Sequence, residues 1–218
     1  MDYQIYEPDD FVVRSGLTLR DARLAYKTYG TLNENKDNVI LYPTRFGGTH
    51  ADNEYLIGEG MALDPTKYFI VVPNLLGNGL SSSPSNASIP FDRSRFPRLT
   101  VHDNVLLQEK LLREVFGIEE IALVVGWSMA AQQAYHWAAL FPDRVKRLAP
   151  IAGSARTSPH NYVFLEGVKT ALITDPEWRG GWYEKQPQAG LRAMGRVWAG
   201  WALSHEFYRK HMYLDLGY

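Results

Sequence analysis

The 218-residue sequence contains no cysteine, which excludes disulfides, thiolate metal sites and a cysteine nucleophile. It also lacks any apolar run approaching the roughly 18 residues that a membrane-spanning helix needs. Its first ten residues, MDYQIYEPDD, are acidic and polar, whereas a secretory signal peptide is basic and then apolar. These absences predict a cytoplasmic protein without a membrane partner.

An excess of charge of one sign is missing as well. The 23 Lys and Arg residues and 24 Asp and Glu residues are interspersed and give a formal net charge of -1. The sequence has no run of basic residues that could follow a phosphate backbone. We therefore expect a small or neutral partner and no nucleic acid. The histidines and carboxylates show no H-E-x-x-H or comparable spacing, so no metal site is expected. The length and the 45% hydrophobic content suit one domain with a sizeable core.

The most informative segment reads IALVVGWSMAAQQA. Residues 121–125 predict a strand and residues 129–140 predict a helix, and the turn between them has the pattern G-x-S-x-A. A sharp strand-to-helix turn exposes a serine to a substrate, a base and backbone N–H groups at once. Such a turn needs small residues two before and two after the serine, and Gly126 and Ala130 meet that need. The pattern predicts that Ser128 is a nucleophile, and the alternative is an ordinary helix N-cap.

Short apolar runs alternate with helical stretches along the rest of the sequence, which predicts a mostly parallel sheet with flanking helices. The N-terminal section is expected to be antiparallel. Asp103 lies near the start of a helix, where a negative charge suits the helix dipole. The expected strands are 11–13, 24–29, 39–42, 68–72, 121–125 and 145–151, and the expected helices are 101–116 and 129–140.

This order of elements resembles the α/β-hydrolase fold, with the serine after about the fifth strand and a glycine-rich turn after an earlier one. Within that fold the sequence is similar to the homoserine O-acetyltransferase family over nearly the whole chain. The segments that carry the likeness are ALDPTKYFI (62–70), NLLGNG (74–79), FPRLTVHD (96–103), VGWSM (125–129), IAGSAR (151–156) and DPEWRGG (175–181).

The resemblance implies acyl transfer through an acyl-serine, with a Ser-Asp-His triad and an oxyanion hole. Ser128 matches the acylated serine, and the N–H of Met129 directly after it matches one oxyanion-hole donor. The resemblance places the second donor at the N–H of Arg45, or of Phe46 if the register is off by one. The implied partners are a small acyl donor and an alcohol or water acceptor, with acyl-CoA as a co-substrate, no bound cofactor and a homodimer. Without the likeness, Gly47-Gly48 also reads as a plain turn.

The strand-to-helix turn that carries Ser128, called the nucleophile elbow, departs from the family pattern. Transferases of the family carry Gly-Gly-Ser-Met-Gly-Gly, whereas residues 126–131 read GWSMAA and place the indole of Trp127 beside the nucleophile. Homoserine is therefore not established as the acceptor, and an ester hydrolase, in which water discharges the acyl-enzyme, is the alternative. The family resemblance also implies a basic residue that binds a substrate carboxylate. Arg192 and Arg196 are both near the expected position, and the role is assigned to neither.

Residues 1–155 are predicted to form the N-terminal part of the hydrolase core, and residues 156–218 a helical, aromatic-rich, lid-like insertion. In this fold the chain order is serine, acid and then histidine. Because the sequence ends in lid-like residues, we expect an N-terminal fragment of a longer protein, with the triad acid and histidine beyond Tyr218. The lid aromatics are interpreted mainly as packing, with a pocket rim or a subunit interface as the alternative.

Internal histidines are weaker candidates for the base. His160 is the best placed, because it follows the strand after the nucleophile. His136 lies eight residues after Ser128 on the same predicted helix, about 12 Å along its axis. His50, His102, His205 and His211 are interpreted as loop, helix-start or solvated lid residues. A non-catalytic binding protein that retains the elbow as a relic remains the second class of hypothesis.

Overall fold

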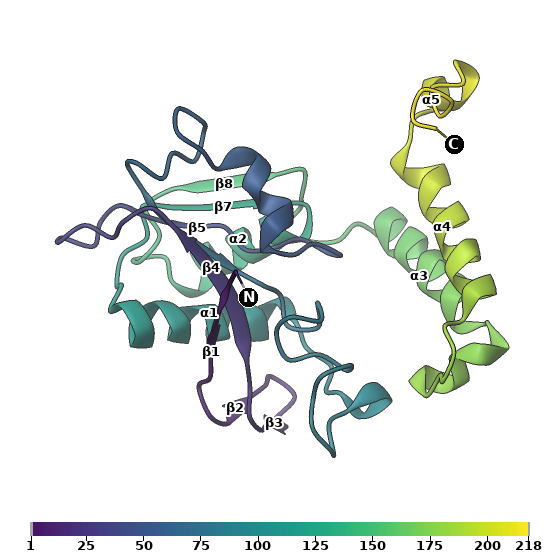
Figure 1. The fold of residues 1–218 in the computed structure, drawn as a ribbon, viewed down its shortest axis with the longest axis horizontal. Coiled ribbons are helices and arrows are strands. Elements are labelled where there is room, and N and C mark those ends of the chain that lie inside the picture. Colours follow the sequence, from purple (N-terminus) through teal and green to yellow (C-terminus); the bar gives the residue numbers. More distant parts are fainter. Residues whose placement is uncertain (1, 218) are drawn as a thin grey trace. The chain divides into compact units, whose positions relative to one another are not determined.

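The structure is a computed structural model that describes residues 2–217 (Figure 1). The chain divides into two compact units, residues 1–156 and 157–218. The first unit contains all the strands that the structure describes, and the second contains only helices. The interpretation of the second unit as a lid stays a prediction.

A six-stranded sheet forms the centre of the first unit, in the order β1-β4-β6-β5-β7-β8. Strands β6, β5, β7 and β8 are parallel to one another, whereas β4 pairs antiparallel with both β1 and β6. This arrangement confirms the predicted mostly parallel sheet with an antiparallel N-terminal section. The strands are β1 (Gln4–Tyr6), β4 (Leu24–Tyr29), β5 (Val39–Leu41), β6 (Phe69–Pro73), β7 (Leu123–Trp127) and β8 (Leu148–Ile151).

Several strands differ from the prediction in their limits. The short β2 (Phe11–Val12) pairs with β3 (Thr18–Leu19) and β4 pairs with β1, and neither β1 nor β3 was predicted. Strand β7 begins later than predicted and continues to the serine, because Trp127 still pairs with Ile151 of β8. Strand β8 begins at Leu148, since Val145 makes only an isolated bridge.

The two predicted helices of the first unit, α1 (Val101–Phe116) and α2 (Met129–Leu140), are confirmed at both ends. At the start of α1, the Thr100 side chain accepts from the Asp103 N–H while Asp103 accepts from the Thr100 N–H. This capping box satisfies two N–H groups that a helix N-terminus leaves unpaired. Asp103 also accepts from the Arg14 N–H at 2.6 Å, so it does more than complement the helix dipole.

The core lies on both faces of the sheet. Helices α1 and α2 pack on one face, where apolar side chains of α1, α2 and alternate strand residues form the larger cluster. The opposite face carries a smaller cluster, against which parts of the segment after β5 pack, including the end of the 3-10 helix η1 (His50–Leu56). The larger cluster includes Leu41, Val71, Leu107, Leu111, Val124 and Trp137, and the smaller one includes Ile40, Tyr42, Ile70, Val72 and Val125.

The second unit is built around two packed helices, α3 (Pro159–Ile173) and α4 (Gln188–Ala202). The ring of Phe164 stacks on Trp201 with centroids 4.5 Å apart, so part of the aromatic content packs within the unit. The remaining short helices of the chain are η2 (Arg93–Arg95), η3 (Pro176–Gly181) and α5 (His205–Arg209). Among residues 2–217, no helix has the length and apolar character needed to cross a bilayer.

Candidate active site

The turn between β7 and α2 has the geometry of a nucleophile elbow. Ser128 joins the strand to the helix with φ 58° and ψ -122°, a backbone conformation that residues other than glycine seldom adopt. Its N–H donates to the Ile151 carbonyl of β8 and its carbonyl accepts from the Ala131 N–H, both at 2.9 Å. The Ser128 side chain makes no capping hydrogen bond, which speaks against the ordinary N-cap interpretation.

Close backbone contacts explain the small residues around Ser128. A Cβ atom added at Gly126 would lie 2.2 Å from the Ala130 carbonyl oxygen. A Cβ atom at Gly153, which follows β8, would lie 2.5 Å from the Ala131 Cβ atom and 2.6 Å from the Ser128 carbonyl oxygen. The predicted need for small residues at the turn is therefore met by Gly126, and Gly153 adds a second close approach that the sequence pattern did not indicate.

The sheet brings the loop after β5 to the same edge as Ser128. Strands β5 and β7 are adjacent and parallel, with Leu41 paired to Val124. Arg45 follows Leu41 by the same number of residues as Ser128 follows Val124. Because the carboxyl ends of parallel strands meet at one edge, the two predicted site segments emerge beside each other.

At this edge, both of the N–H groups that the sequence predicted as oxyanion-hole donors have no hydrogen-bond partner within residues 2–217. They belong to Arg45, after β5, and to Met129, the first residue of α2. An unpaired N–H is expected in the first turn of a helix, but unpaired groups in loops are less common. Both groups are available to an acceptor from a ligand, which is the property that an oxyanion hole requires.

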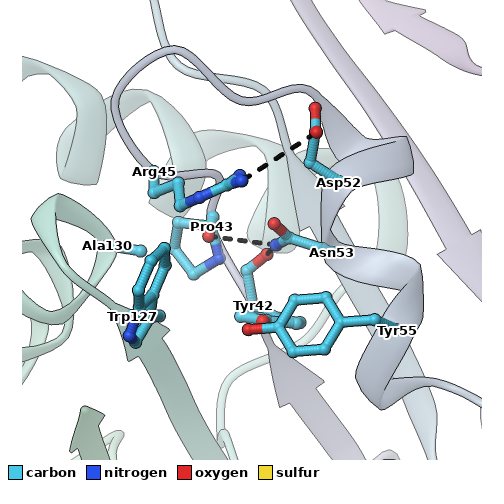
Figure 2. Close-up of a pocket in the computed structure, with 8 residues that line it drawn as sticks. All are labelled: Tyr42, Pro43, Arg45, Asp52, Asn53, Tyr55, Trp127 and Ala130. Atoms are coloured by element: carbon cyan, nitrogen blue, oxygen red, sulfur yellow. Dashed lines mark hydrogen bonds and ion pairs between the residues drawn. The ribbon is translucent and has the colours of Figure 1, made fainter. Parts of the chain in front are cut away.

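The Arg45 side chain covers the indole next to the serine. Its guanidinium carbon lies 5.3 Å from the centroid of the Trp127 ring, and Nη2 lies 3.9 Å from Asp52 Oδ1 (Figure 2). The Arg45 Nη1 atom is buried and has no hydrogen-bond partner among the described residues. Hydrogen bonds from Thr49, first from its N–H, hold the pKa of Asp52 below its usual range, so this carboxylate is ionised beside the cation.

A narrow hollow lies between Trp127 and η1, and Figure 2 shows its lining side chains. It has no room for a water molecule, so it is packed space rather than a substrate cavity. The Asn53 side chain connects η1 to the residues that follow β5, because its Nδ2 donates to the carbonyls of Tyr42 and Pro43 at 3.1 and 3.2 Å. The lining residues are Tyr42, Pro43, Arg45, Asp52, Asn53, Tyr55, Trp127 and Ala130.

The histidines of the first unit have other roles. His50 is 3% exposed, and its ring nitrogens lie 3.3 Å from Asp2 Oδ1 and 3.2 Å from Asn74 Nδ2, so neither is free to serve Ser128. The His136 ring packs edge-on against His102, and burial, with the His102 charge second, lowers the pKa of His136. No hydrogen bond that the structure describes joins a histidine to Ser128.

In the second unit His160 packs against Trp201, with ring centroids 4.5 Å apart. Among the residues that the structure describes, no group of three His, Asp or Glu side chains could hold a metal ion. The predictions that the protein needs neither a metal nor a bound cofactor stay predictions.

Comparison with known proteins gives the family. A family model described as the alpha/beta hydrolase fold matches residues 37–197, which include both the Arg45 loop and the elbow. The chain belongs to the alpha/beta hydrolase fold family. The fold predicted from the sequence is thereby confirmed, and the elbow lies at the position where this fold carries its nucleophile.

Named relatives of this alpha/beta hydrolase are esterases and acetyltransferases. An ethyl acetate hydrolase of Pseudomonas veronii is 44% identical over 209 residues, covering 94% of this chain and 60% of the relative. A homoserine O-acetyltransferase of Leptospira biflexa is 37% identical over 216 residues, covering 89% of this chain and 57% of the relative, which confirms the predicted resemblance.

Among solved structures, an acetylester hydrolase from Corynebacterium glutamicum matches with a TM-score of 0.94 and 42% identity, covering 99% of this chain and 63% of that one. The chain thus spans about three fifths of the length of the relatives that it matches.

Sequence reasoning did not single out Gln133, whose side chain donates to the Thr44 carbonyl on the loop after β5. Gln133 lies on the buried face of α2 and is 0% exposed. It shares that face with Ala130, Ala134 and Trp137, at the spacing of one helix face. The sequence did contain a signal for Gln133, because it is a polar residue at a position of the predicted helix where the pattern calls for an apolar one.

Proposed function

We propose that this alpha/beta hydrolase carries out serine-dependent acyl transfer to water, hydrolysing esters of small acids such as acetate. The observation that carries the proposal is the elbow: a strained, uncapped Ser128 at the same sheet edge as two unpaired N–H groups. The ethyl acetate hydrolase and the acetylester hydrolase among the relatives support a short acyl group.

In the proposed reaction, the Ser128 hydroxyl attacks the ester carbonyl carbon. Its proton passes to a histidine base, and the N–H groups of Met129 and Arg45 donate to the oxyanion of the tetrahedral intermediate. The intermediate collapses when the C–O bond to the alcohol breaks and the alcohol leaves with the proton. Water then attacks the acyl-serine by the same route and releases the acid.

The triad acid and histidine are not assigned among the described residues. The chain order of this fold places both after the nucleophile, and the sequence led us to expect them beyond Tyr218. That expectation stays a prediction. It can be checked by reading the gene downstream and by substituting the first Asp and His that follow.

Transfer of an acetyl group to homoserine is the second candidate, because of the relatives named homoserine O-acetyltransferase. Acyl-CoA would then be the co-substrate. Trp127 favours water as the acceptor of the acyl group, because its indole stands where the family's transferases carry glycine. The indole also stacks under Arg45. An indole in place of glycine beside the nucleophile reduces the space for a second bulky substrate.

The experiment compares acceptors. Protein expressed from the complete reading frame is incubated with ethyl acetate, p-nitrophenyl acetate or acetyl-CoA, with and without L-homoserine, and acetate and O-acetylhomoserine are quantified. We expect acetate from both esters and no O-acetylhomoserine. Ser128→Ala should lower hydrolysis by about 10³-fold or more.

Ser154→Ala provides the matched control, because Ser154 is an exposed serine on the neighbouring loop. It should hydrolyse esters at the wild-type rate. If O-acetylhomoserine were the main product, the acetyltransferase hypothesis would replace the hydrolase hypothesis. Unchanged hydrolysis in Ser128→Ala would reject Ser128 as the nucleophile of either reaction. A wild type that does not exceed the uncatalysed rate would favour the non-catalytic hypothesis.

The cytoplasmic location and the homodimer expected from the sequence also stay predictions. The proposed partner is a small-molecule ester, which suits a surface without a run of one charge.

A further inference from the structure

Behind the elbow lies a chain of three buried side-chain hydrogen bonds. Trp137 Nε1 donates to Gln108 Oε1 at 2.8 Å, and Gln108 Nε2 donates to Gln133 Oε1 at 2.7 Å. Gln133 Nε2 then donates to the backbone carbonyl of Thr44 at 3.0 Å. All four residues are 0% exposed, so the chain crosses from α2 to α1 and back to α2, and ends on the loop after β5 without contact with water.

A buried amide side chain is costly unless all its hydrogen-bonding groups are paired, whereas an apolar residue of the same size carries no such requirement. Packing alone does not require glutamine at either position. An amide that is hydrogen-bonded at both its oxygen and its nitrogen does, however, fix the direction of its partner, because both of its ends are directional. The partner fixed here is the Thr44 carbonyl.

Thr44 is also held at its other polar groups. Its N–H donates to the Pro73 carbonyl at 3.1 Å, and its hydroxyl oxygen accepts from the Leu75 N–H at 3.0 Å. These bonds place Thr44, but among the hydrogen bonds made by residues 2–217 only the one from Gln133 acts on the peptide group that Thr44 shares with Arg45. That peptide group is planar and trans, so its C=O and N–H point in opposite directions. Orienting the Thr44 carbonyl therefore orients the Arg45 N–H.

We propose that Gln133 is a positioning residue for the oxyanion hole, which turns the Thr44–Arg45 peptide so that the Arg45 N–H faces the reacting carbonyl. The inference rests on the proposed function, in which that N–H stabilises the oxyanion. One helix then fixes both donors, since α2 begins with Met129 and carries Gln133 just over one turn later. Donors held in place before the reaction need no reorganisation in the transition state.

The test uses Gln133→Leu, which keeps the approximate volume and removes the donor to Thr44. With p-nitrophenyl acetate, kcat should fall by about 10- to 100-fold while KM changes little, because the lost interaction acts on the transition state. The inhibition constant of a trifluoromethyl ketone, which forms a tetrahedral oxyanion adduct, should rise by the same factor as kcat/KM falls. Active sites are counted by saturating fluorophosphonate labelling, so that kcat refers to folded protein.

Trp137→Phe is the matched control, because it breaks the far end of the same buried chain and leaves the bond from Gln133 to Thr44 in place. Its melting temperature should fall, but kcat and the ketone affinity should stay near the wild-type values. If Gln133→Leu does not fold, Gln133→Met provides a more flexible side chain of similar size for the same measurements.

Two outcomes overturn the inference. Either kcat falls equally in Gln133→Leu and Trp137→Phe, or Gln133→Leu changes only stability or KM; in both cases Gln133 is structural. Failure of the proposed function looks different, since Ser128 of the wild type would then not be labelled and Ser128→Ala would keep full hydrolysis. Labelling of Ser128 with unchanged kcat in Gln133→Leu rejects the positioning role alone.

Discussion

Gly126 is the residue at which the elbow is most sensitive to a single methyl group. The Cβ atom of an alanine there would lie 2.2 Å from the Ala130 carbonyl oxygen and 2.7 Å from the Ala131 nitrogen. Both contacts are to backbone, so the turn itself has to move. We expect Gly126→Ala to lower the free energy of unfolding by about 3 kcal/mol, as overpacking does, and to abolish labelling of Ser128.

Urea denaturation and fluorophosphonate labelling measure the two effects. Gly195→Ala is the control, because Gly195 lies inside α4 with nothing within 4 Å of an added Cβ atom. That substitution should be neutral or stabilising by up to about 1 kcal/mol. Wild-type labelling of a stable Gly126→Ala protein would show that the turn tolerates a wider spacing than the structure indicates.

The backbone N–H of Arg45 can be separated from its side chain. Arg45→Pro removes the N–H, because proline has none. Arg45→Ala keeps the N–H and removes the side-chain contacts with Trp127 and Asp52. We expect kcat for p-nitrophenyl acetate to fall about 100-fold in Arg45→Pro and much less in Arg45→Ala. Melting temperatures of both proteins control for distortion of the loop.

A loss of the same size in both variants would assign the effect to the guanidinium rather than to the N–H. If Phe46→Pro lost activity and Arg45→Pro did not, the donor would be the next residue along the loop. The register inferred from the sequence would then be off by one.

At this scale the sequence predicts residues whose chemistry is local. Ser128, Gly126 and Met129 are contiguous in one motif, so the pattern alone locates them. Gly153 and Gln133 contribute through contacts between segments distant in the sequence, from β8 to the elbow and from α2 to the β5 loop. No local pattern contains those distances.

Among the elements, the turn before β6 depends on one buried carboxylate. Asp64 is 4% exposed and accepts from the Thr66 hydroxyl and N–H at 2.7 and 2.9 Å and from the Gly60 N–H at 3.1 Å. These bonds, led by the Thr66 hydroxyl, hold the pKa of Asp64 well below its usual range. The folded pKa is therefore below the unfolded value of about 3.9.

A depressed folded pKa gives stability that is present above about pH 4 and is lost as the pH falls toward the folded pKa. Asp64→Asn removes the charge at every pH. We expect its melting temperature to lie below that of the wild type by a constant gap from pH 6 to about pH 4, and the gap to narrow between about pH 4 and pH 2. Melting temperatures across this range test the expectation, and a gap that stays constant down to about pH 2 would contradict it.

Helices were easier to predict than strands. The limits of α1 and α2 follow from local signals, such as the Thr100 cap, the Gly117 C-cap at φ 59° and the elbow itself. Strands β1 and β3 are only three and two residues long. They exist because β4 and β2 offer partners, and pairing between distant segments leaves little periodicity in the sequence.

For the whole molecule, the join between the two units is a segment without regular structure. Residues 152–158 are exposed and lie between β8 and α3, and Arg156 is the last residue of the first unit. We expect brief trypsin treatment of the folded protein to cut first after Arg156, because proteases attack exposed irregular segments. Mass spectrometry of the fragments identifies the site.

Substituting Arg156→Gln should remove that first cut and leave the remaining cleavage pattern unchanged. First cleavage inside α1 or α2 would contradict the stability that their buried contacts imply. The outcome bears on the predicted domain boundary at residues 155 and 156, which the sequence placed where the apolar strand ends and the aromatic helices begin.

The fold class of the whole chain was predictable because several motifs occur in one order, and the family match over residues 37–197 agrees with them. The acceptor was not predictable. It depends on the shape of the space beside Ser128, to which Trp127 and Arg45 contribute through side-chain packing rather than through a motif.

The nucleophilic role of Ser128 is the central claim, and covalent labelling tests it most directly. Protein from the complete reading frame is treated with a fluorophosphonate, digested and mapped by mass spectrometry. We predict one label per chain, on the peptide that contains Ser128, and none in Ser128→Ala. An unlabelled wild type, or a label on another residue that persists in Ser128→Ala, would contradict the account.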